Sequence, residues 1–121
     1  MSKLQDALSS GKFTVTAELG PPADPDPDAV RSVAKALVPA VTAANVTDNQ
    51  AATVKMSPVA CAVLMQEEGL EPILQLTARD RNLMALQSEL IGAWALGVRS
   101  VLALSGDPLA VGQYGELASA V

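Results

Sequence analysis

The sequence contains no histidine and only one cysteine, Cys61, among its 121 residues. Catalytic Ser–His and Cys–His pairs within the chain are therefore excluded, because each of them needs a histidine. Most zinc sites are excluded for the same reason, since they use histidine or several cysteine ligands, and no metal is expected. A lone cysteine cannot form an intramolecular disulfide, which is typical of proteins from the reducing cytoplasm. We therefore predict a cytoplasmic location.

Basic and aromatic residues are also scarce. Eight Lys and Arg residues stand against thirteen Asp and Glu residues, which gives a net charge of −5, and only one Phe, one Trp and one Tyr are present. A net acidic chain without a basic run repels phosphate backbones, so no nucleic-acid partner is expected. No stretch of about 20 residues lacks charged or turn residues, so no membrane span is predicted either.

Hydrophobic residues, in contrast, make up half of the chain. This content excludes a disordered protein and predicts a single domain over residues 1–121. Four apolar runs rich in β-branched residues or Leu begin about 30 residues apart, a spacing typical of strands separated by helices. These runs are residues 13–19, 41–47, 72–77 and 100–105. Asp26 before Pro27 and Ser57 before Pro58 predict the starts of two of the intervening helices.

A strand and a helix repeated in this way indicate βαβ units and a parallel sheet. The first turn, residues 18–22, reads ELGPP and is neither GxGxxG nor GxxxxGK[ST], so the nucleotide-binding fingerprint of open sheets is missing. The regular repeat favours a (β/α)8 barrel of the TIM type, which typically needs about 250 residues. The chain is therefore expected to hold about four βα units, as half of a barrel or as a small open α/β domain.

Alternation gives each predicted strand two faces. The residues predicted to point into the barrel are Thr14, Thr16 and Glu18; Ala43, Asn45 and Thr47; Ile73, Gln75 and Thr77; and Val101, Ala103 and Ser105. Phe13, Val15, Ala17 and Leu19 are expected to face the helices. Each inward face becomes polar toward its C-terminal end, and residues 48–50, 79–80 and 106–107 add further polar groups. Because parallel α/β proteins bind ligands at the C-terminal ends of their strands, a binding site is predicted there.

Two charged residues follow the third predicted strand, and each is expected to have a structural role. Asp80 is expected to cap a helix that runs from about residue 81 to residue 96, and Arg79 is expected to be a surface charge.

Five sequence segments in order go beyond these patterns: FTVTAELGPP (13–22), NVTDNQ (45–50), LQLTARDRN (74–82), ALQS (85–88) and LALSGD (102–107). Together they closely resemble the methylenetetrahydrofolate reductase family in its bacterial form. The resemblance implies a (β/α)8 barrel in which FAD passes a hydride to 5,10-methylenetetrahydrofolate and yields 5-methyltetrahydrofolate. It thus implies a flavoprotein oxidoreductase of one-carbon metabolism and methionine biosynthesis.

The resemblance also implies roles for individual residues. Glu18 matches the general acid of the family, which protonates a folate nitrogen and opens the five-membered ring to an iminium. Asp107 matches an aspartate between flavin and folate, whose charge stabilises the iminium and influences the flavin potential. Flavin contacts are implied for Thr47, Gln75, Leu104, Ser105, Gly106 and Asp107. Many members of the family have His in place of Gln75 and Arg in place of Ser105.

The barrel of this family needs roughly twice the length of the chain. We therefore expect a second half, supplied by another copy in a homo-oligomer, by a partner chain or by an unseen part of the same gene. The electron donor stays open among NADH, NADPH, ferredoxin and another subunit. Two alternatives also stay open: a non-catalytic half-barrel that keeps these residues by descent, and another folate- or flavin-binding barrel such as a methyltransferase component.

Overall fold

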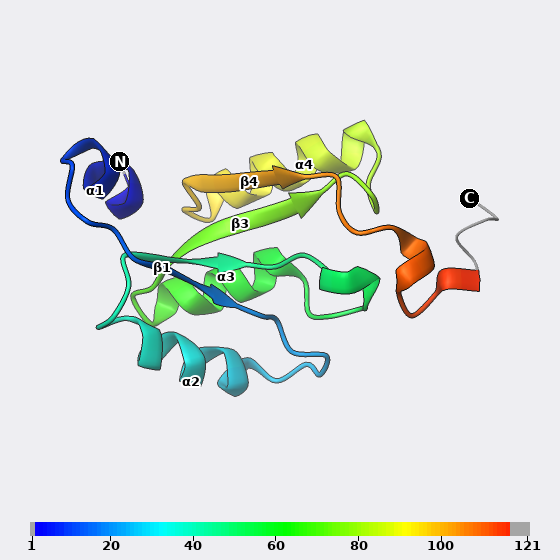
Figure 1. Ribbon diagram of the computed structural model, residues 1–121, viewed down its shortest axis with the longest axis horizontal. Helices are drawn as coiled ribbons and strands as arrows, with labels where there is room; N and C mark the ends of the chain where they lie inside the picture. The colour runs from blue at the N-terminus through cyan, green and yellow to red at the C-terminus, as the bar shows by residue number, and fades with distance from the viewer. Residues whose placement is uncertain (1, 117–121) are drawn as a thin grey trace.

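Four parallel strands form one sheet in chain order, β1-β2-β3-β4 (Figure 1). The structure is a computed structural model that describes residues 2–116. The strands are β1 (Thr16–Leu19), β2 (Ala43–Val46), β3 (Glu71–Thr77) and β4 (Ser100–Leu104). The helices are α1 (Lys3–Ser9), α2 (Pro27–Leu37), α3 (Pro58–Glu67) and α4 (Leu83–Ala95), with short 3₁₀ turns η1 (Gln50–Ala52) and η2 (Leu109–Val111). The predicted alternation of strands and helices is confirmed.

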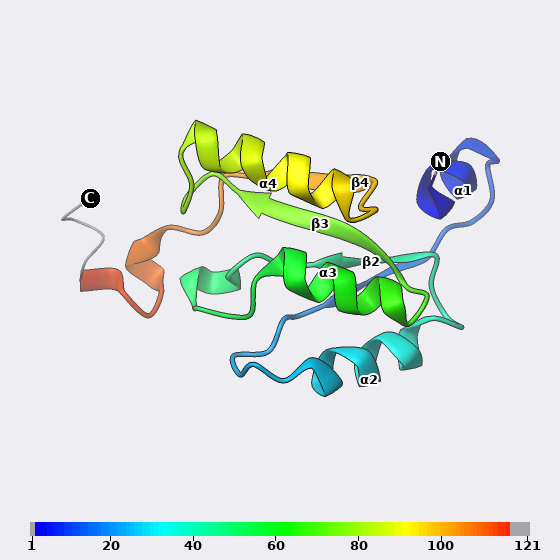
Figure 2. The same cartoon turned by 180° about the vertical axis from the view of Figure 1, so that it is seen from behind.

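Helices α2, α3 and α4 lie on the same face of the sheet (Figure 2). One buried cluster joins them to the strands: Val30, Ala34, Cys61, Ala62, Met65 and Ala93 from the helices, with Leu19, Ala44, Val46, Leu74 and Leu76 from the strands. A doubly wound sheet would carry helices on both faces and a reversal in strand order. The observed order and the single helix layer are therefore those of a partial TIM-barrel-like domain.

Helix α1 lies apart from this layer, at the N-terminal ends of the strands (Figure 1). The backbone N–H groups of Lys3 and Leu4 donate to the two carboxylate oxygens of Glu71 at 2.8 and 2.9 Å. Glu71 is the first residue of β3, so α1 is attached at the end of the sheet opposite the predicted site. No helix in residues 2–116 is long and apolar enough to cross a membrane.

The N-cap residue predicted from the sequence is confirmed for α2 but not for α4. Asp26 caps α2 as predicted, because its carboxylate accepts from two backbone N–H groups of the first turn at 3.0 and 3.2 Å. Helix α4 is capped by Asn82, whose side chain accepts from the N–H of Ala85 at 2.9 Å. The prediction for Asp80 was wrong because its carboxylate is instead bound to the guanidinium of Arg79.

The prediction that Val101 and Ala103 of the fourth strand point into the barrel was also wrong. Paired residues of parallel strands point to the same side of a sheet, and here Gln75 pairs with Leu102 while Thr77 pairs with Leu104. Leu102 and Leu104 therefore share the open face, and Val101 and Ala103 point toward the helix side. Alternation could not decide this orientation, because residues 101–104 are apolar on both faces.

The first strand begins three residues later than predicted. Ala17 and Leu19 pack toward the helices as expected, whereas Phe13 lies before β1 and is 96% exposed. Val15 is also exposed. The prediction that Phe13 packs against the helix layer was therefore wrong, because it lies before the strand and pairing with β2 begins only at Thr16. Val15 is not buried by the helix layer either.

Candidate active site

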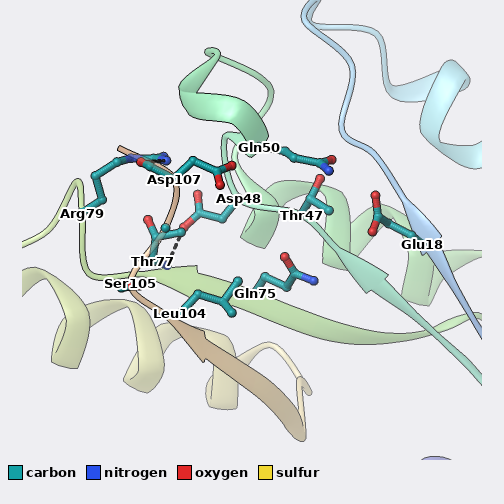
Figure 3. A pocket seen from close by; sticks show the side chains of 11 residues that line it. Glu18, Thr47, Asp48, Gln50, Gln75, Thr77, Arg79, Leu104, Ser105 and Asp107 are labelled. Atoms are coloured by element: carbon teal, nitrogen blue, oxygen red, sulfur yellow. Dashed lines mark hydrogen bonds between the residues drawn. The ribbon is translucent and has the colours of Figure 1, made fainter. Parts of the chain in front are cut away.

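A hollow of about 280 Å³ lies at the C-terminal ends of the strands (Figure 3). Its lining includes every residue for which the family resemblance implied a role: Glu18, Thr47, Gln75, Leu104, Ser105, Gly106 and Asp107. The other lining residues are Asp48, Gln50, Thr77 and Arg79. Ligand pockets usually measure about 300–1,000 Å³, so the hollow has the size of part of a binding site.

The two candidate catalytic carboxylates approach the hollow from different strands. Glu18 lies near the end of β1 and pairs with Asn45 of β2, so it is on the open face of the sheet and exposed. Asp107 follows β4, and Figure 3 shows the two carboxylates at opposite ends of the hollow, with Thr47 and Gln75 between them. A ligand that contacts both carboxylates therefore has to lie across the strand ends.

Polar side chains form the floor between these carboxylates. The amide nitrogen of Gln75 donates to the amide oxygen of Asn45 at 3.4 Å, which leaves its other N–H and its carbonyl oxygen for a ligand. Thr77 is 2% exposed, and its hydroxyl has no hydrogen-bond partner among the described residues. Since buried hydroxyls are normally hydrogen-bonded, this unpartnered group fits a site that holds a polar ligand.

Gly106, the residue before Asp107, packs closely against Thr77 and Arg79 and so positions Asp107. Gly106 has a φ of +85°, and a Cβ on it would lie 3.1 Å from the Cβ of Thr77 and 3.2 Å from the Cβ of Arg79. Glycine is therefore needed for both conformation and space. The next residue, Asp107, accepts a hydrogen bond from the N–H of Ala51 at 2.9 Å, which connects the β4 loop with η1.

A buried ion pair lies beneath the part of the hollow near Asp107 (Figure 3). The Asp48 side chain is almost fully buried, accepts from the backbone N–H of Thr77 at 2.8 Å and pairs with Arg81. The sequence pattern placed residue 48 among the polar groups after the second strand. It contained no signal for the partner, because residues 48 and 81 lie 33 positions apart and meet only through strand pairing.

The prediction that Arg79 is a surface charge was wrong. Its side chain is 8% exposed and forms a two-bond contact with Asp80, from Nε at 2.8 Å and from Nη2 at 2.7 Å. This hydrogen-bonded contact lowers the pKa of Asp80 below its ordinary value, and the same contact raises the pKa of Arg79. Both groups are therefore charged at neutral pH.

The comparisons with known proteins agree with this architecture. A search of curated proteins finds no match. The family model described as methylenetetrahydrofolate reductase, however, matches residues 3–119, nearly the whole chain. The resemblance expected from the five sequence segments is thereby confirmed, and the chain belongs to the methylenetetrahydrofolate reductase family.

Proposed function

We propose that the chain provides the N-terminal half of a (β/α)8 barrel that reduces 5,10-methylenetetrahydrofolate to 5-methyltetrahydrofolate with FAD. Membership of the family indicates a reductase-type function. The observation that supports the finer proposal is the convergence of all seven implied site residues on one hollow. These residues come from four strands that span about 90 positions of the chain, so their convergence depends on the fold.

The polar groups of the hollow fit the hydrogen-bonding edge of a flavin ring, which carries both carbonyl oxygens and an N–H. The free N–H and carbonyl of Gln75 and the unpartnered hydroxyl of Thr77 offer complementary groups. The residues that would hold the cofactor are Thr47, Gln75, Leu104, Ser105, Gly106 and Asp107. When bound, FAD would supply the hydride for the reaction.

Glu18 would act as the general acid. It is exposed on the open face at the end of β1, so it can donate a proton to a folate nitrogen and regain one from water. Proton transfer to that nitrogen would open the five-membered ring of the substrate and leave an iminium. Among the described residues that line the hollow, Glu18 is the one candidate acid on its side, since Figure 3 places Asp48 and Asp107 away from it.

Asp107 would stabilise the positive charge of that iminium. One of its carboxylate oxygens is bound to the N–H of Ala51, which leaves the other oxygen to face a ligand. A fixed negative charge at this place favours a cation in the substrate and needs no reorganisation when the cation forms.

The edges of the sheet support the proposal of a second half. Among the described residues, β1 and β4 each have one paired neighbour only, and Val101, Leu102 and Leu104 of β4 are substantially exposed. A closed barrel pairs all of its strands and covers such residues. We propose that a second copy or a partner chain supplies the remaining strands, and that NAD(P)H or another donor reduces the flavin.

Removal of the acid function of Glu18 tests the proposed reaction. In the assembled protein, the flavin is reduced chemically, and its reoxidation by methylenetetrahydrofolate is followed anaerobically, so the natural electron donor is not needed. Glu18→Gln is expected to retain flavin but to slow reoxidation by about 10²–10⁴-fold. Glu89→Gln, on α4 outside the hollow, is the matched control and should react at the parental rate.

Each alternative predicts a different outcome of this experiment. If the parent protein binds flavin but does not transfer electrons to the folate, a different flavin-binding barrel is indicated. A parent protein without flavin and without turnover would indicate a non-catalytic half-barrel. Parental rates in Glu18→Gln would contradict the assignment of the acid alone.

A further inference from the structure

A single guanidinium group connects the three loops that border the hollow. Arg79 follows β3, and its Nη1 donates to the backbone oxygen of Asp107 at 3.0 Å in the loop after β4. Its Nη2 donates to the backbone oxygen of Asn49 at 3.2 Å in the loop after β2. The two bonds to Asp80 hold the same group in the loop after β3. Arg79 therefore joins loops whose strands are neighbours in the sheet.

These four hydrogen bonds occupy most of the donors of the side chain. A guanidinium has five N–H groups, so only one N–H on Nη1 is left for a ligand. The side chain is almost fully buried, and its charge is balanced by the carboxylate of Asp80, which it contacts directly. Arg79 is thus suited to hold the protein in place rather than to bind a ligand or to change the net charge of the hollow.

The loop after β2 requires such support. Asn49, Ala51 and Ala52 adopt left-handed φ values of 44°, 57° and 53°, which non-glycine residues rarely adopt. Conformations of this kind persist only where surrounding contacts hold them. The N–H of Gln113 donates to the carbonyl of Ala52 at 3.3 Å. Two further contacts join the segment to the loops after β3 and β4: Arg79 binds the carbonyl of Asn49, and the carboxylate of Asp107 binds the N–H of Ala51.

We propose that Arg79 is a positioning residue that fixes the carboxylate of Asp107 relative to η1. It acts on Asp107 twice, directly through the backbone oxygen and indirectly through the loop that donates the Ala51 N–H. Lysine cannot replace it, because one ammonium group cannot reach acceptors in three loops in the planar arrangement of a guanidinium. The geometric part of the inference stands on these contacts, whereas its consequence for catalysis rests on the proposed function.

Amide hydrogen exchange at Ala51, measured by NMR on the full chain, tests the geometric part. Arg79→Lys is expected to accelerate exchange of this N–H by about tenfold or more, since its bond to a charged acceptor is weakened. Arg31→Lys is the matched control, because Arg31 also contacts several acceptors at once, here three carboxylates, but lies on α2 away from the hollow. Unchanged exchange at Ala51 in Arg79→Lys would overturn the proposal.

A second variant covers the case in which Arg79→Lys does not fold. Asp80→Asn keeps the arginine but removes the charge of the carboxylate that holds it. It is expected to accelerate exchange at Ala51 in the same direction, by a smaller factor, while exchange at the buried Leu74 stays at the parental rate. A parental exchange rate at Ala51 in this variant would overturn the proposal in that case.

A double-mutant cycle on folate reduction tests the catalytic part. Arg79→Lys is expected to lower kcat by up to about 100-fold, because misplacement of a catalytic group costs this much, and to leave KM less affected. If Arg79 acts through Asp107, the loss in Arg79→Lys combined with Asp107→Asn should be no larger than in Asp107→Asn alone. If the double variant instead loses the product of the two single losses in kcat, the proposal that Arg79 acts through Asp107 is overturned. An inactive parent protein would instead refute the proposed function, and the exchange experiment would still decide the role of Arg79.

Discussion

The two faces of the sheet differ in what covers them. On the helix face, Val46 and Leu74 are fully buried in the cluster that joins the helices to the strands. On the opposite face, Glu18 is exposed and Gln75 is partly exposed, at the rim of the hollow. Leu74 and Gln75 are consecutive in β3, so neighbouring residues serve different purposes. This sheet therefore carries its packed core on one face and the proposed site on the other, and the following changes test that separation.

The largest effect is expected from a cavity on the covered face. Leu74→Ala should lower the free energy of unfolding by about 2–5 kcal/mol, because its fully buried side chain leaves a space that the neighbours cannot fill. For the chain without its proposed second half, Leu102→Ala, on the open face and 43% exposed, is the matched change and should cost less than about 1 kcal/mol. Urea unfolding of both variants measures the difference. Equal losses would show that the open face is covered in solution.

A change of charge on the open face should alter the bound flavin without altering stability. Asp107→Asn keeps an oxygen that can accept from the Ala51 N–H, so the loop geometry is retained. Because a nearby anion disfavours the addition of electrons, the variant should raise the flavin midpoint potential by tens of millivolts, on the order of a screened charge interaction. It should also slow folate reduction.

Spectroelectrochemistry measures this potential, and Asp24→Asn, in the exposed loop after β1, serves as the control for a general loss of charge. A midpoint potential in Asp107→Asn at or below that of the parent protein would contradict the proposed place of Asp107 beside the flavin.

The stability of the protein is expected to fall at alkaline pH, because Cys61 is buried on the covered face. Burial raises the pKa of the Cys61 thiol from 9.0 to about 11. Above pH 9 the thiol ionises in the unfolded chain but stays neutral in the folded chain, so stability falls as the pH rises from about 9 to 11. The full loss is about 2–3 kcal/mol. Relative to the parent protein, Cys61→Ala should therefore gain stability between pH 8 and pH 10; parallel curves would show that the thiol is accessible to solvent.

The smallest effect is expected at acid pH, at the rim of the hollow. Arg79 lowers the pKa of Asp80 from its ordinary value of 3.8. The stability that this pair contributes is complete above that value and is lost as the pH falls through the lowered pKa. Because Asp80 is partly exposed, the contribution is below about 1 kcal/mol. Asp80→Asn should thus approach the parent in stability below pH 4, as measured by thermal unfolding at matched ionic strength.

Local sequence signals predicted most of the elements. Asp26 and Pro27 marked the start of α2, because an N-cap acceptor and a proline act within one turn of the helix. The start of α4 was misplaced, since Asp80 and Asn82 are both good caps and the choice depended on the contact between Asp80 and Arg79. That contact is part of the loop arrangement around the hollow, which no local rule describes.

The position of the site residues along their strands was predictable, but the side chains that bind one another around the site were not. Each site residue lies at or just after a strand end, and parallel strands bring these ends together, so the pattern sufficed to group Glu18 with Asp107. The roles of these residues stay predictions. The buried pair of Asp48 with Arg81 and the bonds of Arg79 to the loops after β2 and β4 were missed, because they join residues about 30 positions apart.

The parallel sheet, the strand ends that carry polar groups and the family of the protein were all predictable from the sequence. Its repeats and motifs are local, and each acts within a few residues. Only the tertiary structure decided that Leu102 and Leu104 share the open face with Gln75, because a strand that is apolar on both faces takes its orientation from its pairing with a neighbour. Only the packed loops decided that Arg79 is a buried connection, because its acceptors lie in three segments that meet after the sheet has formed.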